Sequence, residues 1–419
     1  METESNIPFY KFTQENENAL ADTVVIHVPS KEIFMSMFHP AASLYENVTE
    51  EKSVIHCFRY LTEELTSRGI KVKTVRELLK LNRPALESLA FNSLKYIPSE
   101  LNDETSAKNE TFNYYLSDEY KWKVIRKLWM DQLIDVVLSQ PTYTIKHVNK
   151  NTFVEPESIS FNPLGNLLFC RDQQITTRKG IVIGRLFSLQ RDFEIKVMKQ
   201  VFQNLNANII GEIPEGGYVE GGDFFIAKSD LAMCGVGLRT NMKGVNYLME
   251  NDLLGTQRFA IVYDDNDLDQ QRMHLDTYFN ILNEKYVIAL DFDETGKAVD
   301  KKINRKVLLF DNNKDNQEIE CSIKDVSTKV GEYKLVKVYD DFYTFLKDEQ
   351  YEIIKVTNQQ QIDYMINFLN IGNNTVLTCN RDLKNVVKHT GVNVIYIEFR
   401  AVMNMYGALH CATQVARKI

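Results

Sequence analysis

The chain has 419 residues, of which 44% are hydrophobic and 25% charged, so it can bury a sizeable core and exceeds the usual size of a single domain. Its 49 Lys and Arg residues against 57 Asp and Glu give a net charge of -8, which argues against the basic surface that nucleic-acid binding requires. No basic segment followed by an apolar core opens the chain, and no apolar run approaches the ~18 residues needed to cross a bilayer. We therefore expect a cytoplasmic protein without membrane or nucleic-acid partners.

Short β-branched runs alternate with helical patterns along most of the chain, which predicts a mixed α/β fold. The expected strands are Thr23–His27, Ile181–Gly184, Phe224–Ile226, Phe259–Val262, Tyr286–Ala289 and Val394–Ile397. Helices are expected at Val54–Arg68, where Ile55, Phe58, Leu61 and Leu65 recur at helical spacing, and at Phe187–Asn204. Between residues 74 and 148, helix-compatible segments follow one another without a convincing strand, which predicts an inserted helical subdomain with a loop in the polar tract 101–110.

The six cysteines show no Cys-x-x-Cys pair and no regular spacing, so we expect no disulfide framework. Five lie in or beside apolar runs, where cysteine is usually a small core residue: Cys57, Cys170, Cys234, Cys321 and Cys379. Cys411 differs, because polar and small residues surround it near the C-terminus.

Two clusters place carboxylates beside strand-like or glycine-rich sequence. The run Asn166–Asp172 predicts an apolar strand that ends in a carboxylate, although a solvated salt bridge at a strand end is the ordinary alternative. The second cluster contains two Glu-Gly-Gly triplets, and only the one that begins at Glu220 ends in an Asp, Asp223, directly before an apolar run. Paired glycines let backbone approach closely, so Glu220 can be held against a ligand, the alternative being a simple tight turn.

Two further clusters contain histidine. In an extended chain, His274 and Asp276 would project to the same face while Leu275 faces the core, although such pairs are also common on surfaces. His410 and Cys411 form the last cluster. A cysteine nucleophile needs a base or a nearby positive charge, which His274 could supply. Paired carboxylates in turn suit a guanidinium, whose planar fork of donors would leave its central carbon open to the sulfur.

The ordered motifs resemble those of arginine deiminases, members of the guanidine-modifying superfamily, over residues 20 to 419. These motifs are Asn166–Asp172, Arg191 with Glu194, Glu220-Gly221-Gly222-Asp223, Gly237-Leu238-Arg239-Thr240, His274-Leu275-Asp276-Thr277 and Cys411. The resemblance implies a five-bladed α/β-propeller, or pentein, of ββαβ units around a central channel, with residues 74–148 inserted. It also implies hydrolysis of free L-arginine to citrulline and ammonia through a covalent thiouronium, without metal or cofactor.

Residue roles follow from the same resemblance. Cys411 corresponds to the nucleophile and His274 to the general acid and base, while Asp172 and Asp276 grip the guanidinium and Glu220 orients it or His274. The residues expected to bind substrate are Asn166, Phe169, Arg191, Asp223 and Arg239, with the arginines facing the α-carboxylate.

Several alternatives stay open. Agmatine or methylarginine hydrolases and amidinotransferases use related chemistry, and the loop Asn404–Leu409 lacks the arginine usual in arginine deiminases, which motivates a catalytically silent arginine-binding protein. A zinc site of His274, Asp276, His410 and Cys411 has suitable ligand types, but the spacing matches no common zinc motif. The sequence leaves homo-oligomer formation open.

Overall fold

The computed structural model describes most of the chain. The described residues are 12–102, 108–148, 153–264, 266–299, 302–323 and 325–419. Residues 103–107, the centre of the predicted polar loop 101–110, lie outside this part of the chain.

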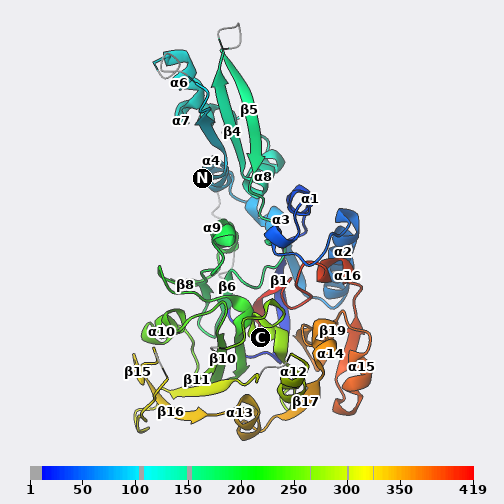
Figure 1. The fold of residues 1–419 in the computed structure, drawn as a ribbon. Coiled ribbons are helices and arrows are strands. Elements are labelled where there is room, and N and C mark those ends of the chain that lie inside the picture. The colour runs from blue at the N-terminus through cyan, green and yellow to red at the C-terminus, as the bar shows by residue number, and fades with distance from the viewer. Residues whose placement is uncertain (1–11, 103–107, 149–152, 265, 300–301, 324) are drawn as a thin grey trace, which may run out of the picture.

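Five sheet units of one connectivity recur in the described part of the chain (Figure 1). The units are β21 (Gln414–Lys418), β1 (Ala21–Ile26) and β2 (Lys71–Thr74); β6 (Gln174–Thr176), β7 (Ile181–Ile183) and β8 (Ile209–Glu212); β9 (Phe224–Lys228), β10 (Leu231–Val236) and β11 (Arg258–Tyr263); β12 (Phe279–Ile281), β13 (Tyr286–Leu290) and β17 (Glu352–Val356); β18 (Leu369–Gly372), β19 (Thr375–Thr378) and β20 (Asn393–Tyr396). In every unit the first two strands pair antiparallel and the last two pair parallel.

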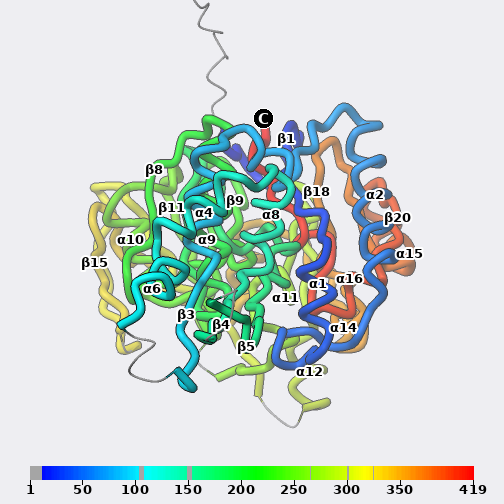
Figure 2. Tube along the Cα trace, turned by 90° about the horizontal axis from the view of Figure 1, so that it is seen from above, coloured from blue at the N-terminus to red at the C-terminus, as the bar shows by residue number. Residues whose placement is uncertain are grey.

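The parallel step of each unit requires a crossover, because a tight turn can join only antiparallel strands. The crossovers of four units contain α2 (Glu51–Ser67), α9 (Asp192–Asn204), α10 (Met242–Glu250) and α15 (Leu383–Val386). In Figure 2, α2, α10 and α15 lie at the periphery of the molecule. The remaining crossover is longer and contains α12 (Phe292–Ala298), β14 (Lys306–Asp311), β15 (Lys329–Val330), β16 (Tyr333–Tyr339) and α13 (Phe342–Asp348). Its three strands extend the sheet of β9 to β11.

The predicted strands and the long helices are confirmed, with boundaries shifted by a few residues. Helix α2 forms because Val54, Phe58, Leu61 and Leu65 recur every three or four residues and are all fully buried, whereas Ile55 is only half-buried. The prediction of a strand at Asn166–Asp172 is wrong. This run forms turns in which the amides of Leu167 and Phe169 bond to carbonyls three residues back, and strand β6 starts only at Gln174.

Residues 74–148 do contain helices, but the absence of strands predicted there is wrong. The helices are α3 (Val75–Leu79), α4 (Arg83–Ser93), α6 (Glu110–Leu116), α7 (Asp118–Ile125) and α8 (Met130–Ser139), and the strands β3 (Lys95–Pro98), β4 (Pro141–His147) and β5 (Val154–Phe161) form a sheet. Strand β4 is rich in β-branched and aromatic residues, which favour a pleated surface. Figure 1 shows these elements from α4 to β5 extending away from the rest of the molecule, and the sheet continues past residue 148.

Short helices complete the described structure. They are α1 (Lys31–Ser36), α11 (Leu275–Tyr278), α14 (Asn358–Ile362) and α16 (Arg400–Met403). The apolar side chains gather in four clusters that join neighbouring units, so the core follows the sheets. None of the helices in the described ranges is both long enough and apolar enough to span a membrane.

Candidate active site

The predicted catalytic residues and Asp223 lie at equivalent places in the fold, just before the first strand of a sheet unit. Asp172 precedes β6, Glu220 and Asp223 precede β9, His274 and Asp276 precede β12, and Cys411 precedes β21. Asn367, which was not predicted, precedes β18 in the same way. Each of the five units therefore contributes polar side chains from the same position.

The glycine pair before β9 allows two of these segments to meet. The backbone amide of Gly221 donates to the carbonyl oxygen of Asp172 over 3.0 Å. A Cβ atom on Gly221 would lie 1.9 Å from the backbone oxygen of Arg171, and one on Gly222 would lie 2.8 Å from Nδ1 of His274. Side chains are excluded at both positions by these close approaches.

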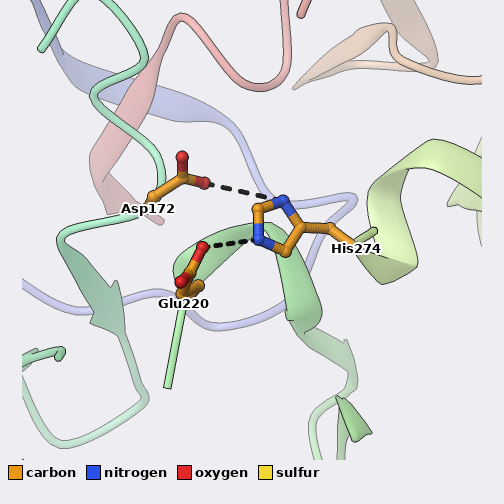
Figure 3. A group of neighbouring side chains, drawn as sticks. All are labelled: Asp172, Glu220 and His274. Carbon is orange, nitrogen blue, oxygen red and sulfur yellow. Dashed lines mark hydrogen bonds and ion pairs between the residues drawn. The ribbon is translucent and has the colours of Figure 1, made fainter. Parts of the chain in front are cut away.

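The imidazole of His274 lies between two carboxylates (Figure 3). Its Nε2 donates to Oε2 of Glu220 over 2.8 Å, and its Nδ1 lies 3.9 Å from Oδ1 of Asp172. Burial disfavours the charged ring, but the charge of Asp172 and the hydrogen bond to Glu220 outweigh burial and raise the pKa of His274 to about 10. Burial raises the pKa of the Glu220 carboxyl, but the hydrogen bond from His274 and the charges of His274, Arg191 and Arg239 together lower it to about 2. His274 is therefore an imidazolium at neutral pH. Of the two Glu-Gly-Gly triplets, only the second brings its glutamate to His274, because Glu215 of the first triplet is exposed.

Asp223 fixes the start of α11. Its Oδ1 accepts a hydrogen bond from the backbone amide of Leu275 over 2.9 Å, and its Oδ2 accepts one from Oγ1 of Thr240 over 2.6 Å. Burial raises the pKa of Asp223 to about 7, against the opposing charge of His274. Both carboxylate oxygens of Asp223 are thus used within the protein.

The predicted extended conformation of residues 274–276 is wrong beyond His274. His274 has extended φ and ψ angles, but α11 begins at Leu275, because the amide of Leu275 is bonded by Asp223 in the manner of a helix start. Leu275 is buried in the core as expected. The two functional side chains therefore have different partners: His274 bonds to Glu220, and Asp276 bonds to His410.

Cys411 lies in a polar corner formed by three side chains. Its Sγ is 3.5 Å from Oδ2 of Asp276 and 3.2 Å from Nδ2 of Asn367. Nδ1 of His410 donates to the same Oδ2 of Asp276 over 2.7 Å. Burial, together with the charges of Asp276 and Asp172, raises the pKa of the Cys411 thiol above its ordinary value. The resting sulfur is therefore a thiol whose S–H can donate to Asp276.

Arg191 ends the short 3-10 helix Leu189–Arg191 and lies buried between Asp172 and Glu194. Its Nη1 donates to Oδ2 of Asp172 over 2.8 Å, its Nε and Nη2 donate to Oε2 of Glu194, and Nη2 also donates to the backbone oxygen of Asn166. All three nitrogens of Arg191 are therefore engaged. The other carboxylate oxygen of Asp172, Oδ1, is buried and accepts no hydrogen bond from any described residue, and the same holds for Oδ1 of Asp276.

The remaining predicted residues have separate environments. Asn166 donates from Nδ2 to the backbone oxygen of Ser43. Phe169 packs so closely on Gly407 that a Cβ atom at Gly407 would lie 2.2 Å from the Phe169 ring. Arg239 donates from Nη2 to Oε1 of Gln270 over 2.9 Å, and its buried Nε has no partner.

A narrow pocket opens beside Asn367. Its lining includes Gln270, Met273, Thr277, Tyr364 and Tyr406. Tyr406 has a φ of 60°, a left-handed conformation that non-glycine residues rarely adopt. A larger cavity of about 590 Å³ lies between α12 and α13, and none of the predicted site residues lines it.

The His274 group and the Cys411 group are neighbours. The backbone amide of Arg171 donates to the carbonyl oxygen of Cys411 over 3.1 Å, which places Asp172 next to the segment of the cysteine. The charge of His274 helps to lower the pKa of Asp276, although burial acts in the opposite direction. The charge of Asp172 helps to raise the pKa of the Cys411 thiol. Asn367 could have been suspected from the sequence, because it is a polar residue inside the apolar run Met365–Leu369.

Within the described residues, one group of side chains has the geometry to hold a metal: Asp172, Glu220 and His274, whose ligand atoms lie within 4.8 Å of one another. Of the four residues considered for zinc, only His274 belongs to this group. A metal ion there would have to displace the proton of His274, because only the neutral imidazole binds metals.

Sequence comparisons identify similar proteins. A family model described as arginine deiminase matches residues 43–418. The arginine deiminase of Metamycoplasma arthritidis is 25% identical over 237 residues, 55% of this chain and 55% of that protein. The arginine deiminase of Halobacterium salinarum is 20% identical over a 491-residue alignment that covers 94% of both chains. In several such comparisons the chain spans about half the length of the curated relatives it matches.

Solved structures share the fold. Dimethylarginine dimethylaminohydrolase from Pseudomonas aeruginosa, complexed with citrulline, has a TM-score of 0.52 at 12% identity and covers 94% of this chain and 98% of its own. An amidinotransferase from Microseira wollei has a TM-score of 0.51 at 12% identity and covers 97% of each chain. At these identities the comparison concerns the fold alone, and the chain has the mixed α/β fold of these structures.

Proposed function

Because this chain belongs to the arginine deiminase family of hydrolases, we propose that it converts free L-arginine and water to L-citrulline and ammonia through a covalent bond to Cys411. The proposal rests on one observation above all. Two buried carboxylate oxygens, Oδ1 of Asp172 and Oδ1 of Asp276, accept no hydrogen bond. Buried acceptors are nearly always satisfied, so these two oxygens call for a donor from a ligand.

A guanidinium suits these oxygens because it presents several N–H donors in one plane and carries a positive charge. Bound between Asp172 and Asp276, it would bring its central carbon to the sulfur of Cys411, which is already 3.5 Å from Asp276. Its charge would also offset the two carboxylates that raise the thiol pKa. Substrate binding thereby favours loss of the thiol proton to solvent, which leaves the thiolate that attacks.

The reaction then needs one group that both gives and takes a proton. Sγ of Cys411 forms a bond to the guanidinium carbon, and the charges of thiolate and substrate cancel in the adduct. The imidazolium of His274 gives its proton to the departing nitrogen, the C–N bond breaks, and ammonia leaves a thiouronium. Neutral His274 next takes a proton from water, and the hydroxide adds to the carbon. The C–S bond breaks, citrulline and the thiolate form, and the remaining hydroxyl proton passes to solvent.

The amino-acid end of the substrate would meet Arg239, whose buried Nε lacks a partner. Arg191 and Asn166 instead have their nitrogens engaged within the protein, and both oxygens of Asp223 are engaged as well. We therefore assign substrate contact to Arg239. Arg191 and Asp223 act by holding Asp172 and the start of α11, and Phe169 shapes the wall beside Gly407.

We also infer that the five sheet units form a five-bladed propeller with the site at its centre. The common connectivity and the equivalent placement of the site residues support this arrangement. The segment 74–148, extended through β5, is then an insertion between the first two units.

The proposal is tested by incubating the protein with L-arginine, agmatine, a methylated arginine and citrulline, and by measuring ammonia and ureido products. We expect ammonia and citrulline from L-arginine, and a loss of both in Cys411→Ser. Cys321→Ser is the matched control, because Cys321 is a free, half-buried thiol that packs against a different apolar cluster from the one that contains Cys411. In the wild type, acid quenching during turnover should add the mass of the amidino-substrate intermediate to the peptide that contains Cys411.

A catalytically silent arginine-binding protein is the second candidate. The loop before the cysteine favours it, because Tyr406 rather than a cation lines the pocket at that point. Calorimetry would then detect arginine binding while no ammonia forms. Ammonia from agmatine alone, or transfer of the amidino group to added glycine, would instead identify another guanidine-modifying activity.

A further inference from the structure

Asn367 occupies the position in its sheet unit at which the other four units supply the proposed catalytic side chains. It lies two residues before β18. Its side chain is polar, yet it is buried between the apolar residues Ile366 and Phe368. No motif suggested a role for it.

Neighbouring backbone groups fix the orientation of the Asn367 amide. The amide nitrogen of Cys411 is a donor and lies 3.3 Å from Oδ1 of Asn367, so Oδ1 must face it. Nδ2 then faces two acceptors, the backbone oxygen of Asp276 at 3.2 Å and Sγ of Cys411 at 3.2 Å. The backbone oxygen of Asn367 also accepts a hydrogen bond from the amide of His410. A flipped amide would set its NH₂ group against the N–H of Cys411.

This side chain is well placed to act on the sulfur. A thiolate at Cys411 is opposed by burial and by the carboxylate of Asp276, 3.5 Å away. The N–H of Asn367 acts in the opposite direction, because a donor bonds more strongly to a thiolate than to a thiol. Unlike a cation, a neutral amide provides this without competing with the substrate for Asp276.

Resting on the cysteine mechanism proposed above, we propose that Asn367 is a further catalytic residue, which donates a hydrogen bond from Nδ2 to Sγ of Cys411 and so stabilises and aims the attacking thiolate. No proton passes through Asn367. When the S–C bond forms, the sulfur loses its charge and the hydrogen bond weakens. When the C–S bond breaks, the same donor stabilises the departing thiolate.

The magnitude follows from the strength of such bonds. Loss of a hydrogen bond to a charged group should raise the thiol pKa by about one to two units. Thiolate would then become roughly 10- to 100-fold scarcer at neutral pH. Since intrinsic nucleophilicity rises with thiol pKa with a slope of about 0.4–0.5, the net loss in attack rate would be roughly 3- to 10-fold.

The test measures the pH dependence of alkylation of Cys411 by iodoacetamide, which requires no arginine, with quantification of the Cys411 peptide by mass spectrometry. Asn367→Ala removes the donor without adding a charge, and Asn367→Asp keeps Oδ1 for the amide of Cys411 but replaces the donor with a carboxylate, whose charge also raises the thiol pKa. Asn370→Ala is the matched control, because Asn370 is a buried asparagine of the same segment that bonds to Asn18, Ile281 and Leu282 instead. Circular dichroism and thermal melting verify that each variant is folded.

We expect the alkylation pKa to rise by at least about one unit in Asn367→Asp and Asn367→Ala and to stay at the wild-type value in Asn370→Ala. A folded Asn367→Ala variant with the wild-type alkylation pKa would overturn the inference, as would an equal shift in Asn370→Ala. The proposed function and this inference can fail independently of each other. If the wild type releases no ammonia from arginine but the alkylation shift is present, the deiminase assignment falls and the hydrogen bond to the thiolate stands.

Discussion

The ionisation of His274 provides the sharpest test of the site, and Glu220→Gln is the change that addresses it. Glutamine keeps the shape of the side chain and an oxygen that can accept from Nε2 of His274, but it removes the negative charge. The two groups are 2.8 Å apart, which at an effective dielectric constant of 20 corresponds to about 6 kcal/mol as an upper bound. Asp172, at 3.9 Å, remains and supplies about 4 kcal/mol on the same basis.

Burial continues to disfavour the imidazolium in the variant, so the pKa of His274 should fall from about 10 by roughly one to three units. The pKa is measured without substrate by NMR titration of protein with ¹³C-labelled histidine, with the His274 signal assigned from its loss in His274→Ala. Glu215→Gln is the control, because it changes the exposed glutamate of the other Glu-Gly-Gly triplet.

The lower pKa has two further consequences. A group whose pKa is raised in the folded state contributes stability in full below its unfolded value of about 6.5 and loses it as pH rises through about 10. Glu220→Gln should therefore lower the free energy of unfolding at neutral pH, and its difference from wild type should shrink above pH 10. The alkaline limit of kcat/KM should move to lower pH, since neutral His274 cannot protonate the departing ammonia. An unchanged pKa near 10 in the variant would refute the assignment of this ionisation to Glu220.

Three more changes probe other parts of the molecule. His274→Ala should bind arginine with little change in calorimetry but reduce turnover by several orders of magnitude, because both proton transfers depend on it; near-normal turnover would exclude it as the acid and base. Arg239→Ala should raise KM for arginine more than KM for agmatine in steady-state assays, and equal effects would remove its role at the carboxylate. Lys418→Met should lower the free energy of unfolding, measured in urea, by about 3–5 kcal/mol, because Glu17 would stay buried without its partner at 3.1 Å. Lys285→Met, which removes an exposed pair with Glu352, should lower it by less than about 1 kcal/mol.

Local sequence patterns predicted the repeating part of the fold well. Strands such as β11 and β13 are short β-branched runs whose burial on both faces produces a continuous apolar pattern, and α2 shows the periodicity of a half-buried helix. The segment 74–148 was harder. Strand β4 has a β-branched and aromatic pattern and pairs antiparallel with the nearby β5, but its parallel pairing with β3, more than forty residues earlier, leaves no local signal.

In the site, too, local motifs were predictable and distant contacts were not. The Glu220-Gly221-Gly222-Asp223 turn was identifiable because glycine marks a close approach, here to His274. The partner of each side chain was not identifiable. Asp276 bonds to a histidine 134 residues away, and Asn367 bonds to a cysteine 44 residues away, so both contacts depend on how the sheet units are arranged. The extended conformation expected after His274 is wrong for a similar reason, since the amide of Leu275 at the start of the helix donates to Asp223, 52 residues away.

The charge distribution explains why a neutral ligand would suit this site poorly. Around Cys411 and His274, buried carboxylates outnumber buried cations. The carboxylates are those of Asp172, Glu194, Glu220, Asp223 and Asp276, and the cations are Arg171, Arg191 and His274. Burying an uncompensated charge is costly, and the cost falls when a cation enters. In the proposed function, the same negative charge that raises the thiol pKa of Cys411 would favour binding of a guanidinium, whose positive charge would in turn favour the thiolate. The reactivity of the sulfur at neutral pH would in this way increase when a cationic substrate binds, because burial and the neighbouring carboxylates favour the thiol in the free protein.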